Sequence, residues 1–278
     1  MDACSIRKML LDGKFENVLI ASHRGKFGSS VMENTVLAFT VAIGQGADMV
    51  EMDLAKTKDG IFIGHHDDDM SRLFHKAGKI QDYTYSEIKQ MPIYNVINEP
   101  CVEHVSTLDE ILSALKEKTI LVLDKCWEHW EDIAPIIKTY NMAEQVVLKF
   151  YIEDAAAASW ALQHQEFMYI PMVQNPNDKE KVYSLKQETT IVGIEILPED
   201  PDSLFLTSGY IKDLHAHGLA VWCNSLNLSS ELVYGGGFDD LKSLRNGGSY
   251  GWGELITRGI DIIQTDWVYE LFSFRKSY

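Results

Sequence analysis

Short runs of aliphatic and β-branched residues alternate along the chain with longer stretches of helical periodicity. This alternation is typical of βαβ units with a parallel sheet. Eight runs are expected to form its strands, at residues 18–23, 49–54, 120–125, 146–150, 169–173, 191–197, 220–226 and 261–267. Eight such strands fit a closed (β/α)8 barrel, the TIM barrel, better than a doubly wound sheet. No GxGxxG follows the first run, which further weakens a dinucleotide-binding interpretation.

Two stretches interrupt this alternation. Residues 67–105 are predicted to form a small insertion after the second strand, and residues 227–253 a long glycine-rich loop after the seventh. Both follow strands, and barrel enzymes keep their active sites on that side. Long loops are usually functional or disordered. We therefore expect a single domain over residues 1–278, in which these two stretches shape a substrate pocket.

The composition does not change the predicted fold, but it disfavours some classes of function. Of 278 residues, 46% are hydrophobic and 24% charged, as in a globular protein with a sizeable core. The net charge of −16 disfavours binding to nucleic acid, which needs clustered Lys and Arg. No apolar run approaches the ~20 residues of a membrane span, and the start lacks a signal-peptide pattern. The four cysteines form no CxxC pair. We expect a cytoplasmic protein with free thiols and no stable membrane insertion; its oligomeric state, a homo-oligomer included, stays open.

Polar side chains collect where the predicted strands end. They are His23, Arg24, Glu51, Asp53, His65, His66, Asp124, Lys125, Lys149, Glu195, Asn224 and Asp266. Strand interiors in a barrel are apolar, so polar groups at strand ends lie in its mouth. The same placement on most of the strands indicates an active site there.

Glu51 and Asp53 lie two residues apart on one strand, so their side chains share a face. Two close carboxylates repel each other, and one would be protonated unless a cation lay between them. A ligand set made only of oxygen favours Mg²⁺ or Ca²⁺. The pair therefore predicts a divalent cation.

Histidines lie on both sides of this pair in the sequence, at His23 and at His66. Two histidines beside a metal can divide the proton transfers of phosphodiester cleavage, one as base and one as acid. Arg24 would hold a phosphate oxygen with its planar guanidinium. His65 adjoins His66, so the alternation along the strand points only one of these two rings into the mouth. This set of groups favours chemistry at a phosphoryl centre.

Five short motifs, spread over most of the chain, occur in the order found in the glycerophosphodiester phosphodiesterases and together resemble that family. They are HRG (23–25), ENT (33–35), ExD (51–53), HDxxMxR (66–72) and GIDIIQTD (259–266). The resemblance implies a TIM barrel with a small insertion after the second strand and a divalent cation, Mg²⁺ or Ca²⁺. It also implies a small-molecule substrate, a glycerophosphodiester, hydrolysed to glycerol 3-phosphate and an alcohol.

The resemblance also implies roles for individual residues. His23 and His66 become the acid/base pair, Arg24 a phosphate ligand, and Glu51 and Asp53 metal ligands.

Further residues are expected to support the site or bind the substrate. Glu33 and Asn34 would support the loop after the first strand. Trp222 and Asn224 resemble a Trp-x-x-Asn-like run of the family, in which Trp222 would form a wall for the glycerol. Glu195, at the end of the sixth strand, is a further candidate for substrate binding.

Three features depart from the family. One is His65 beside His66, where the HDxxMxR register of the family favours His66 as the residue that faces the mouth.

The other two lie at the third strand and before ENT. Where the third strand of the family commonly has Glu-x-Lys, this chain has Asp124 and Cys126. Asp124 would bind the metal directly or through water, and Lys125 or Lys149 would replace the missing ammonium group. Met32 stands where the family usually has proline before ENT, and we expect it to alter the loop but not the chemistry.

Three other functions stay open at this point. A phospholipase acting on intact lipid through a cyclic phosphate would need an exposed apolar rim. A metal-dependent sugar isomerase or aldolase could use the same barrel, since fold does not determine function. A non-catalytic barrel could bind phosphate-containing ligands. The motifs favour hydrolysis of a glycerophosphodiester, and they leave the alcohol undetermined.

Overall fold

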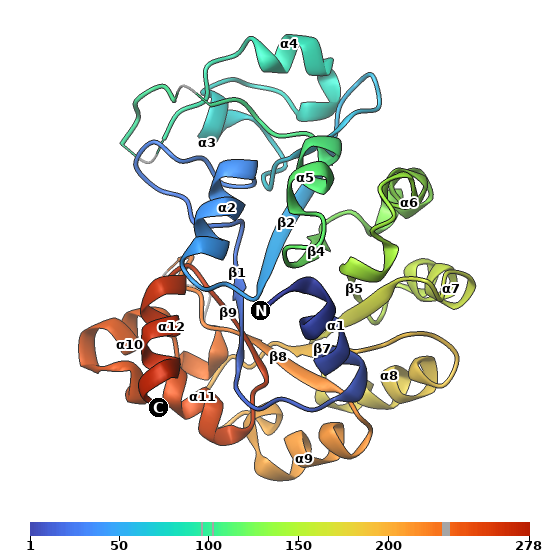
Figure 1. Cartoon of the computed structure of the whole chain (residues 1–278), viewed down its shortest axis with the longest axis vertical. Helices are drawn as coiled ribbons and strands as arrows, with labels where there is room; N and C mark the ends of the chain where they lie inside the picture. Colours follow the sequence, from blue (N-terminus) through green and yellow to red (C-terminus); the bar gives the residue numbers. More distant parts are fainter. Residues whose placement is uncertain (96, 102, 230–233) are drawn as a thin grey trace.

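The computed structural model describes residues 1–95, 97–101, 103–229 and 234–278. Within these residues eight strands run parallel: β1 (Leu19–Ser22), β2 (Met49–Lys56), β4 (Ile120–Asp124), β5 (Val146–Tyr151), β6 (Met168–Val173), β7 (Gly193–Ile196), β8 (Ala220–Asn224) and β9 (Ile262–Thr265). Each pairs with the next, and β1 pairs with both β2 and β9, which closes the barrel (Figure 1). The predicted TIM barrel is confirmed.

Helices surround the barrel on its outer face (Figure 1). They are α2 (Val36–Gly44), α5 (Leu108–Leu115), α6 (Trp130–Thr139), α7 (Ala155–Gln163), α8 (Lys179–Lys186), α9 (Ser208–Ala216), α11 (Trp252–Arg258) and α12 (Val268–Ser277). A further helix, α1 (Ala3–Asp12), buries Ile6 and Leu10 against the inner residues Leu19 and Met49, so it covers the amino-terminal end of the barrel. No helix of the described residues is long and apolar enough to cross a membrane.

The barrel interior explains why the strand ends are polar. Inward-facing residues such as Met49, Val122 and Val147 form an apolar cluster inside the barrel. Side chains alternate along a strand, so the next inward-facing position lies two residues further on. At these positions stand Glu51, Asp124 and Lys149. The apolar layer is therefore followed by a polar one at the carboxyl ends.

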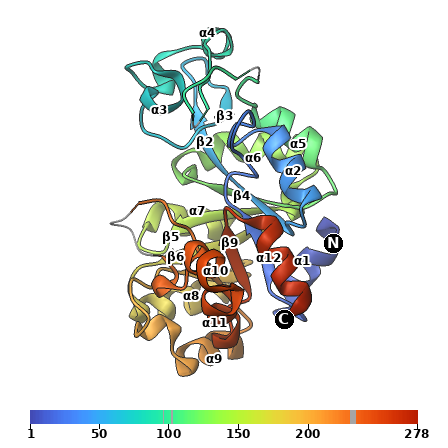
Figure 2. The ribbon, with the colours of Figure 1, turned by 90° about the vertical axis from the view of Figure 1, so that its left-hand side faces the viewer.

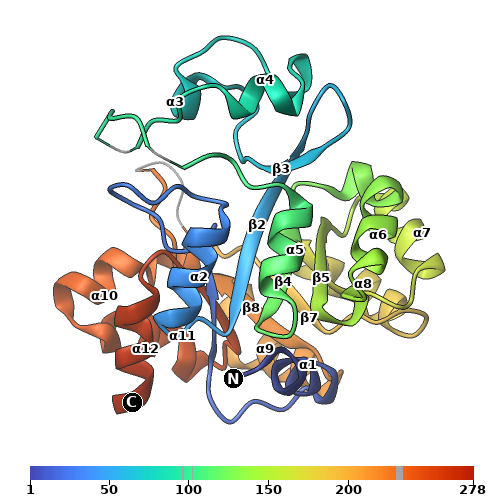
Figure 3. The same cartoon turned by 45° about the horizontal axis from the view of Figure 1, so that its top comes forward.

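One strand, β3 (Phe62–Gly64), lies outside the closed ring and pairs antiparallel with the end of β2. The chain then forms α3 (Ser71–Phe74), η1 (Ile80–Asp82) and α4 (Tyr85–Lys89) before it returns to the barrel at α5. These residues have their own apolar cluster, which includes Ile63, Met70 and Ile88. The segment stands over one side of the barrel (Figures 2 and 3).

The stretch 227–253 differs from the predicted long loop. It contains η6 (Gly235–Gly237), α10 (Asp240–Asn246) and η7 (Gly248–Tyr250), while residues 230–233 lie outside the described part. Asp239 caps α10 by accepting a hydrogen bond of 2.8 Å from the Lys242 N–H, and Gly247, at φ 104°, ends it. The helix α10 has only seven residues, too few to show a clear helical period of apolar residues in the sequence, and glycines lie on both sides of it.

Candidate active site

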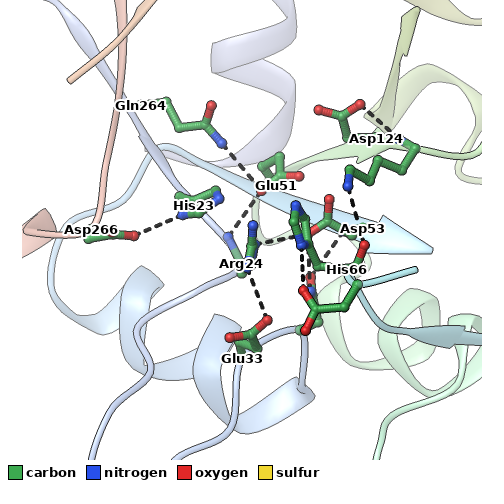
Figure 4. A network of polar contacts seen from close by, with 12 residues as sticks. His23, Arg24, Glu33, Glu51, Asp53, His66, Asp124, Gln264 and Asp266 are labelled. Carbon is green, nitrogen blue, oxygen red and sulfur yellow. Dashed lines mark hydrogen bonds and ion pairs between the residues drawn. The ribbon is translucent and has the colours of Figure 1, made fainter. Parts of the chain in front are cut away.

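A cavity of about 180 Å³ lies at the carboxyl ends of the strands. The predicted site residues that line it are His23, Arg24, Glu51, Asp53, His66, Asp124, Lys125, Lys149, Glu195 and Asn224. Three others, Glu33, Asn34 and Trp222, lie behind its wall and contact residues that line it. Figure 4 shows part of this arrangement.

The His23 ring is held by a carboxylate. Its Nδ1 lies 2.9 Å from Asp266 Oδ1 (Figure 4). The backbone N–H of His23 donates to the Thr265 carbonyl at 3.2 Å. With its proton on Nδ1, the ring keeps Nε2 free as an acceptor. The sequence pattern places Asp266 at a strand end but assigns it no role. Only its place in the last motif marks it.

Arg24 is buried among three carboxylates. Its backbone N–H donates to Glu51 Oε2 at 3.1 Å. In the guanidinium, Nη1 donates to Glu33 Oε1 at 3.1 Å and Nε lies 3.0 Å from Asp53 Oδ2. The backbone here is left-handed, with φ 53° at Arg24 and φ 80° at Gly25. A Cβ at Gly25 would lie 2.7 Å from the Ala38 carbonyl carbon, so the turn requires glycine. The HRG motif thus serves to place this guanidinium.

The ENT motif supports the same residues. Asn34 donates from Nδ2 to Asp53 Oδ2 at 3.2 Å, and its Oδ1 accepts from the Asp53 N–H at 3.0 Å. Thr35 caps α2 by accepting from the Ala38 N–H at 3.2 Å. Glu33 accepts hydrogen bonds from Arg24 and also from Arg72, whose Nη2 lies 2.7 Å from Glu33 Oε1.

The two adjacent histidines point in different directions. His66 lines the cavity, and its Nδ1 lies 2.8 Å from Asp67 Oδ1. The His65 ring is directed instead to the Asp69 carbonyl, with its Nε2 at 3.0 Å. Burial lowers the pKa of both rings.

Asp67 connects His66 to Arg72. Arg72 Nε donates to Asp67 Oδ2 at 2.7 Å. Burial opposes the Asp67 charge, but hydrogen bonds from Arg72 and His66 hold its pKa well below the usual range. Arg72 belongs to the HDxxMxR motif, yet the sequence pattern assigns it no role.

Lys149 places an ammonium group in the mouth, between Asp124 and Glu195. Its Nζ lies 2.7 Å from both Asp124 Oδ2 and Glu195 Oε2. Burial opposes its charge, but the two carboxylates outweigh that cost and raise the pKa of Lys149. Lys125 lies at the exposed rim, where its Nζ donates to the His66 carbonyl at 3.3 Å. Of the two lysines, Lys149 is therefore the one inside the mouth.

Trp222 differs from the predicted glycerol wall. It is fully buried within the apolar cluster of the barrel, and its Nε1 donates to Asn224 Oδ1 at 2.8 Å. Asn224 in turn donates to Glu195 Oε1 at 2.7 Å. Trp222 lies one inward-facing position below the mouth, so it orients Asn224 and does not line the cavity.

The carboxylates Glu51, Asp53 and Asp124 have the donor chemistry of a hard-cation site (Figure 4). Burial raises the pKa of Glu51, and the charges of Asp53 and Asp124 raise it further, an excess of negative charge that a cation would relieve. As the side chains stand, no three His, Cys, Asp or Glu in the described part of the chain form a set that could hold a metal ion. Both oxygens of Asp124 already accept hydrogen bonds, from the Lys125 N–H at 2.7 Å and from Lys149. The donor chemistry fits a divalent cation, although the described residues do not form an assembled metal site.

A closed barrel with polar and titratable groups gathered at its carboxyl-terminal mouth defines the class of TIM-barrel proteins with an enzyme-like site. Within this class the chain belongs to the glycerophosphoryl diester phosphodiesterase family, whose model matches residues 23–266.

Individual relatives are similar over different lengths. A glycerophosphodiester phosphodiesterase of Caldanaerobacter subterraneus subsp. tengcongensis is 31% identical over 141 residues, which cover 48% of this chain and 58% of that protein. The alignment thus spans little more than half of that relative. A crystal structure of a glycerophosphoryl diester phosphodiesterase from Parabacteroides distasonis has a TM-score of 0.80 at 20% identity, with 100% of this chain and 92% of that one covered.

A phosphodiesterase of Oleispira antarctica, solved with the product sn-glycerol-3-phosphate, has a TM-score of 0.68 at 20% identity, with 92% of this chain and 96% of that one covered. At this level of identity the two structural matches show the shared fold.

Proposed function

We propose that this protein hydrolyses glycerophosphodiesters to glycerol 3-phosphate and an alcohol with the help of a divalent cation. Membership of the family supports the reaction class. The observation that carries the proposal is the convergence of His23, Arg24, Glu51, Asp53 and His66 on one cavity at the barrel mouth. The Oleispira antarctica protein with bound sn-glycerol-3-phosphate, which shares this fold, supports the choice of product.

The two histidines would carry the protons of the reaction. His23 is oriented by Asp266 and His66 by Asp67, so each ring has a carboxylate on Nδ1. One ring removes a proton from the attacking oxygen, and the other gives a proton to the alcohol oxygen as its bond to phosphorus breaks. A carboxylate on the far nitrogen stabilises the imidazolium in either role.

Arg24 and the carboxylates would hold the charged groups. Mg²⁺ or Ca²⁺ held by Glu51 and Asp53 would supply positive charge to the phosphoryl oxygens when bound. Asp124, whose oxygens are already hydrogen-bonded, would contribute its charge. Arg24 Nη1 and Nε are engaged by carboxylates, so its remaining donors would bind the phosphate.

The opposite side of the cavity would bind the glycerol. Glu195 and Asn224 line it there and are held by Lys149 and Trp222. Carboxylate and amide groups are suited to hydroxyl groups because each offers hydrogen-bond acceptors.

One experiment tests the reaction and its metal separately. The protein is incubated with glycerophosphocholine and with glycerophosphoethanolamine, each in the presence of Mg²⁺, Ca²⁺ or EDTA, and released glycerol 3-phosphate is measured. We expect release with one of the metals and none with EDTA. No release under any condition would overturn the proposed reaction. Release that persists in EDTA would overturn the metal requirement alone.

A further inference from the structure

A second cleft, of about 470 Å³, adjoins the catalytic cavity. We name it the basic cleft, after Lys56, Lys58, Lys79, Lys125 and His129, which line it. Its walls come from the turn after β2, from η1 and from the residues after β4. The ends of β2 and β3 rise between the insertion and α6 at this side of the molecule (Figure 3).

The basic cleft and the catalytic cavity meet at two shared residues, His66 and Lys125. The Lys125 Nζ donates to the His66 carbonyl at 3.3 Å, which places its ammonium group at this junction. Lys58 and Lys79 line the basic cleft but not the catalytic cavity. A molecule that extends from the phosphate site past His66 therefore enters a space lined by lysines.

These lysines are concentrated in a protein whose net charge is −16. Lys56 pairs with Asp132, whereas Lys58, Lys79 and Lys125 have no carboxylate at ion-pair distance among the residues that the structure describes. Unpaired lysines that share one cleft make a local positive field, which attracts anions and repels cations.

Two acidic residues also line the basic cleft. The carboxylate of Asp67 is occupied by Arg72 and His66. Asp68 is exposed. Among the residues that line the cleft, the lysines therefore outnumber the acidic groups whose charge is not already paired.

The wall that carries Lys58 is anchored to the insertion. The Lys58 N–H donates to the Tyr83 carbonyl at 2.9 Å, and Asp59 Oδ1 accepts from the Tyr85 N–H at 2.9 Å. Asp59 Oδ1 is also bonded to the Thr57 hydroxyl at 2.7 Å. The Lys58 backbone is thus held in place before any ligand binds, which lowers the entropic cost of binding.

We infer that the basic cleft binds a second anionic group carried by the alcohol part of the substrate. The substrate class is then a glycerophosphodiester whose alcohol bears a phosphate ester, in preference to one whose alcohol is neutral or cationic. Lysine ammonium groups bind phosphate oxygens through charge-assisted hydrogen bonds. This inference rests on the proposed function, with the glycerol at Glu195 and Asn224 and the alcohol leaving past His66.

A matched pair of substrates tests the inference. Glycerophosphoinositol and glycerophosphoinositol 4-phosphate differ by one phosphate group, and kcat/KM is measured for both. We expect a preference of about tenfold for the phosphorylated substrate, equivalent to one or two charge-assisted contacts. The preference should shrink as salt is added, because exposed charges are screened.

Substitution of Lys58 and Lys79 locates the effect. The double variant Lys58→Gln/Lys79→Gln should bring the ratio of the two kcat/KM values close to one and leave hydrolysis of glycerophosphoinositol unchanged. Lys118→Gln serves as the control, since Lys118 is an exposed lysine just before β4, at the other end of the barrel. It should change neither value.

The outcomes separate the two proposals. Equal kcat/KM for both substrates, or a preference that survives the double substitution, overturns the basic cleft as a phosphate site and leaves the proposed hydrolysis standing. Hydrolysis of neither inositol substrate, when glycerophosphocholine or glycerophosphoethanolamine is hydrolysed, also overturns the basic cleft alone. Hydrolysis of none of the four substrates, in the metal conditions given above, overturns the proposed function itself.

Discussion

Arg72 donates two parallel hydrogen bonds to Glu33, with Nη1 2.8 Å from Oε2 and Nη2 2.7 Å from Oε1. Glu33 also accepts a hydrogen bond from Arg24. Arg72 also donates to Asp67, which is the hydrogen-bond partner of His66. One side chain of the insertion is thereby joined to both the guanidinium and the histidine of the mouth. Arg72 has no direct place in the cavity lining, so we regard it as a positioning residue.

Replacement of Arg72 should impair turnover more than folding. In Arg72→Met both Glu33 and Asp67 lose their main partner, so we expect kcat to fall about 10- to 100-fold, as for other residues that orient active-site groups. Arg72→Lys keeps the charge but not the paired geometry and should lie between. Steady-state kinetics and thermal unfolding are measured together.

The control for Arg72 is Arg258→Met, which removes a helix-surface pair with Glu254. It should leave kcat unchanged. If Arg72→Met retains wild-type kcat, or if Arg72→Lys is no better than Arg72→Met, the positioning role is wrong.

Asp266→Asn should remove the group that orients His23. Without the carboxylate the ring can adopt the other tautomer, and we expect kcat to fall about 10²- to 10⁴-fold, by analogy with the carboxylate of a catalytic triad. The pair of His215 and Asp261 offers a matched control, since its Nε2 to Oδ2 distance is 2.8 Å and it lies at the start of β9, away from the mouth. Asp261→Asn should spare kcat, and equal losses in the two variants would argue against a specific role for Asp266.

Substitution of the two adjacent histidines tests which of the two rings acts in the cavity. His66→Ala should abolish turnover, because His66 faces the cavity. His65→Ala should have a mild effect, because its ring bonds the Asp69 carbonyl and lies beside Phe74, with the ring centroids 5.9 Å apart. Both variants are assayed with glycerophosphocholine. A larger loss in His65→Ala would show that the assignment of the two rings is reversed.

Lys149→Met should destabilise the fold by roughly 3–5 kcal/mol, since it leaves the charges of Asp124 and Glu195 in the mouth without their partner. Urea unfolding measures the free energy. Adding Asp124→Asn and Glu195→Gln removes those charges and should recover much of the loss. If the triple variant is as unstable as Lys149→Met, the loss comes from packing and not from unpaired charge.

The pH dependence of stability should contain a contribution from Asp240. Burial is the main cause that raises its pKa to about 7, although donors such as Ser225, Trp252 and Thr265 oppose the shift. A raised pKa in the folded state favours the protonated form. The stability it adds is therefore full below pH ~4, the pKa of an unfolded aspartate, and is lost as the pH rises through about 7.

Thermal unfolding between pH 4 and pH 8 measures this contribution. Asp240→Asn should flatten the profile, whereas Asp239→Asn, which replaces one good helix cap by another, should keep it. An unchanged slope in Asp240→Asn would assign the pH dependence to other groups.

Much of the mouth could be predicted because two periodicities reinforce each other. Barrel strands are buried on both faces, so they appear as apolar runs, and the first inward-facing positions beyond the apolar layer carry the charges. Glu51 and Asn224 are found in this way. The same alternation does not tell how deep an inward-facing residue lies, so Trp222 is expected at the mouth although it lies one position lower.

Pairings over long sequence separations have no local signal. Arg72 is 39 residues from Glu33, and Asp266 is 243 residues from His23. Nothing near either residue in the sequence indicates its partner. The position of Lys149 is similar, since β5 follows β4 in the barrel and brings this lysine to Asp124 from a different strand.

The insertion has an apolar cluster separate from the two clusters of the barrel, yet its Arg72 holds Glu33 and Asp67, which contact residues of the mouth. A segment with its own small core can open locally at a lower free energy than the whole protein. Such an opening would withdraw Arg72 from Glu33 and Asp67 and leave the strands intact. If the proposed hydrolysis holds, the resting protein would then include a folded but inactive subpopulation, and its abundance would limit the specific activity of an otherwise native sample.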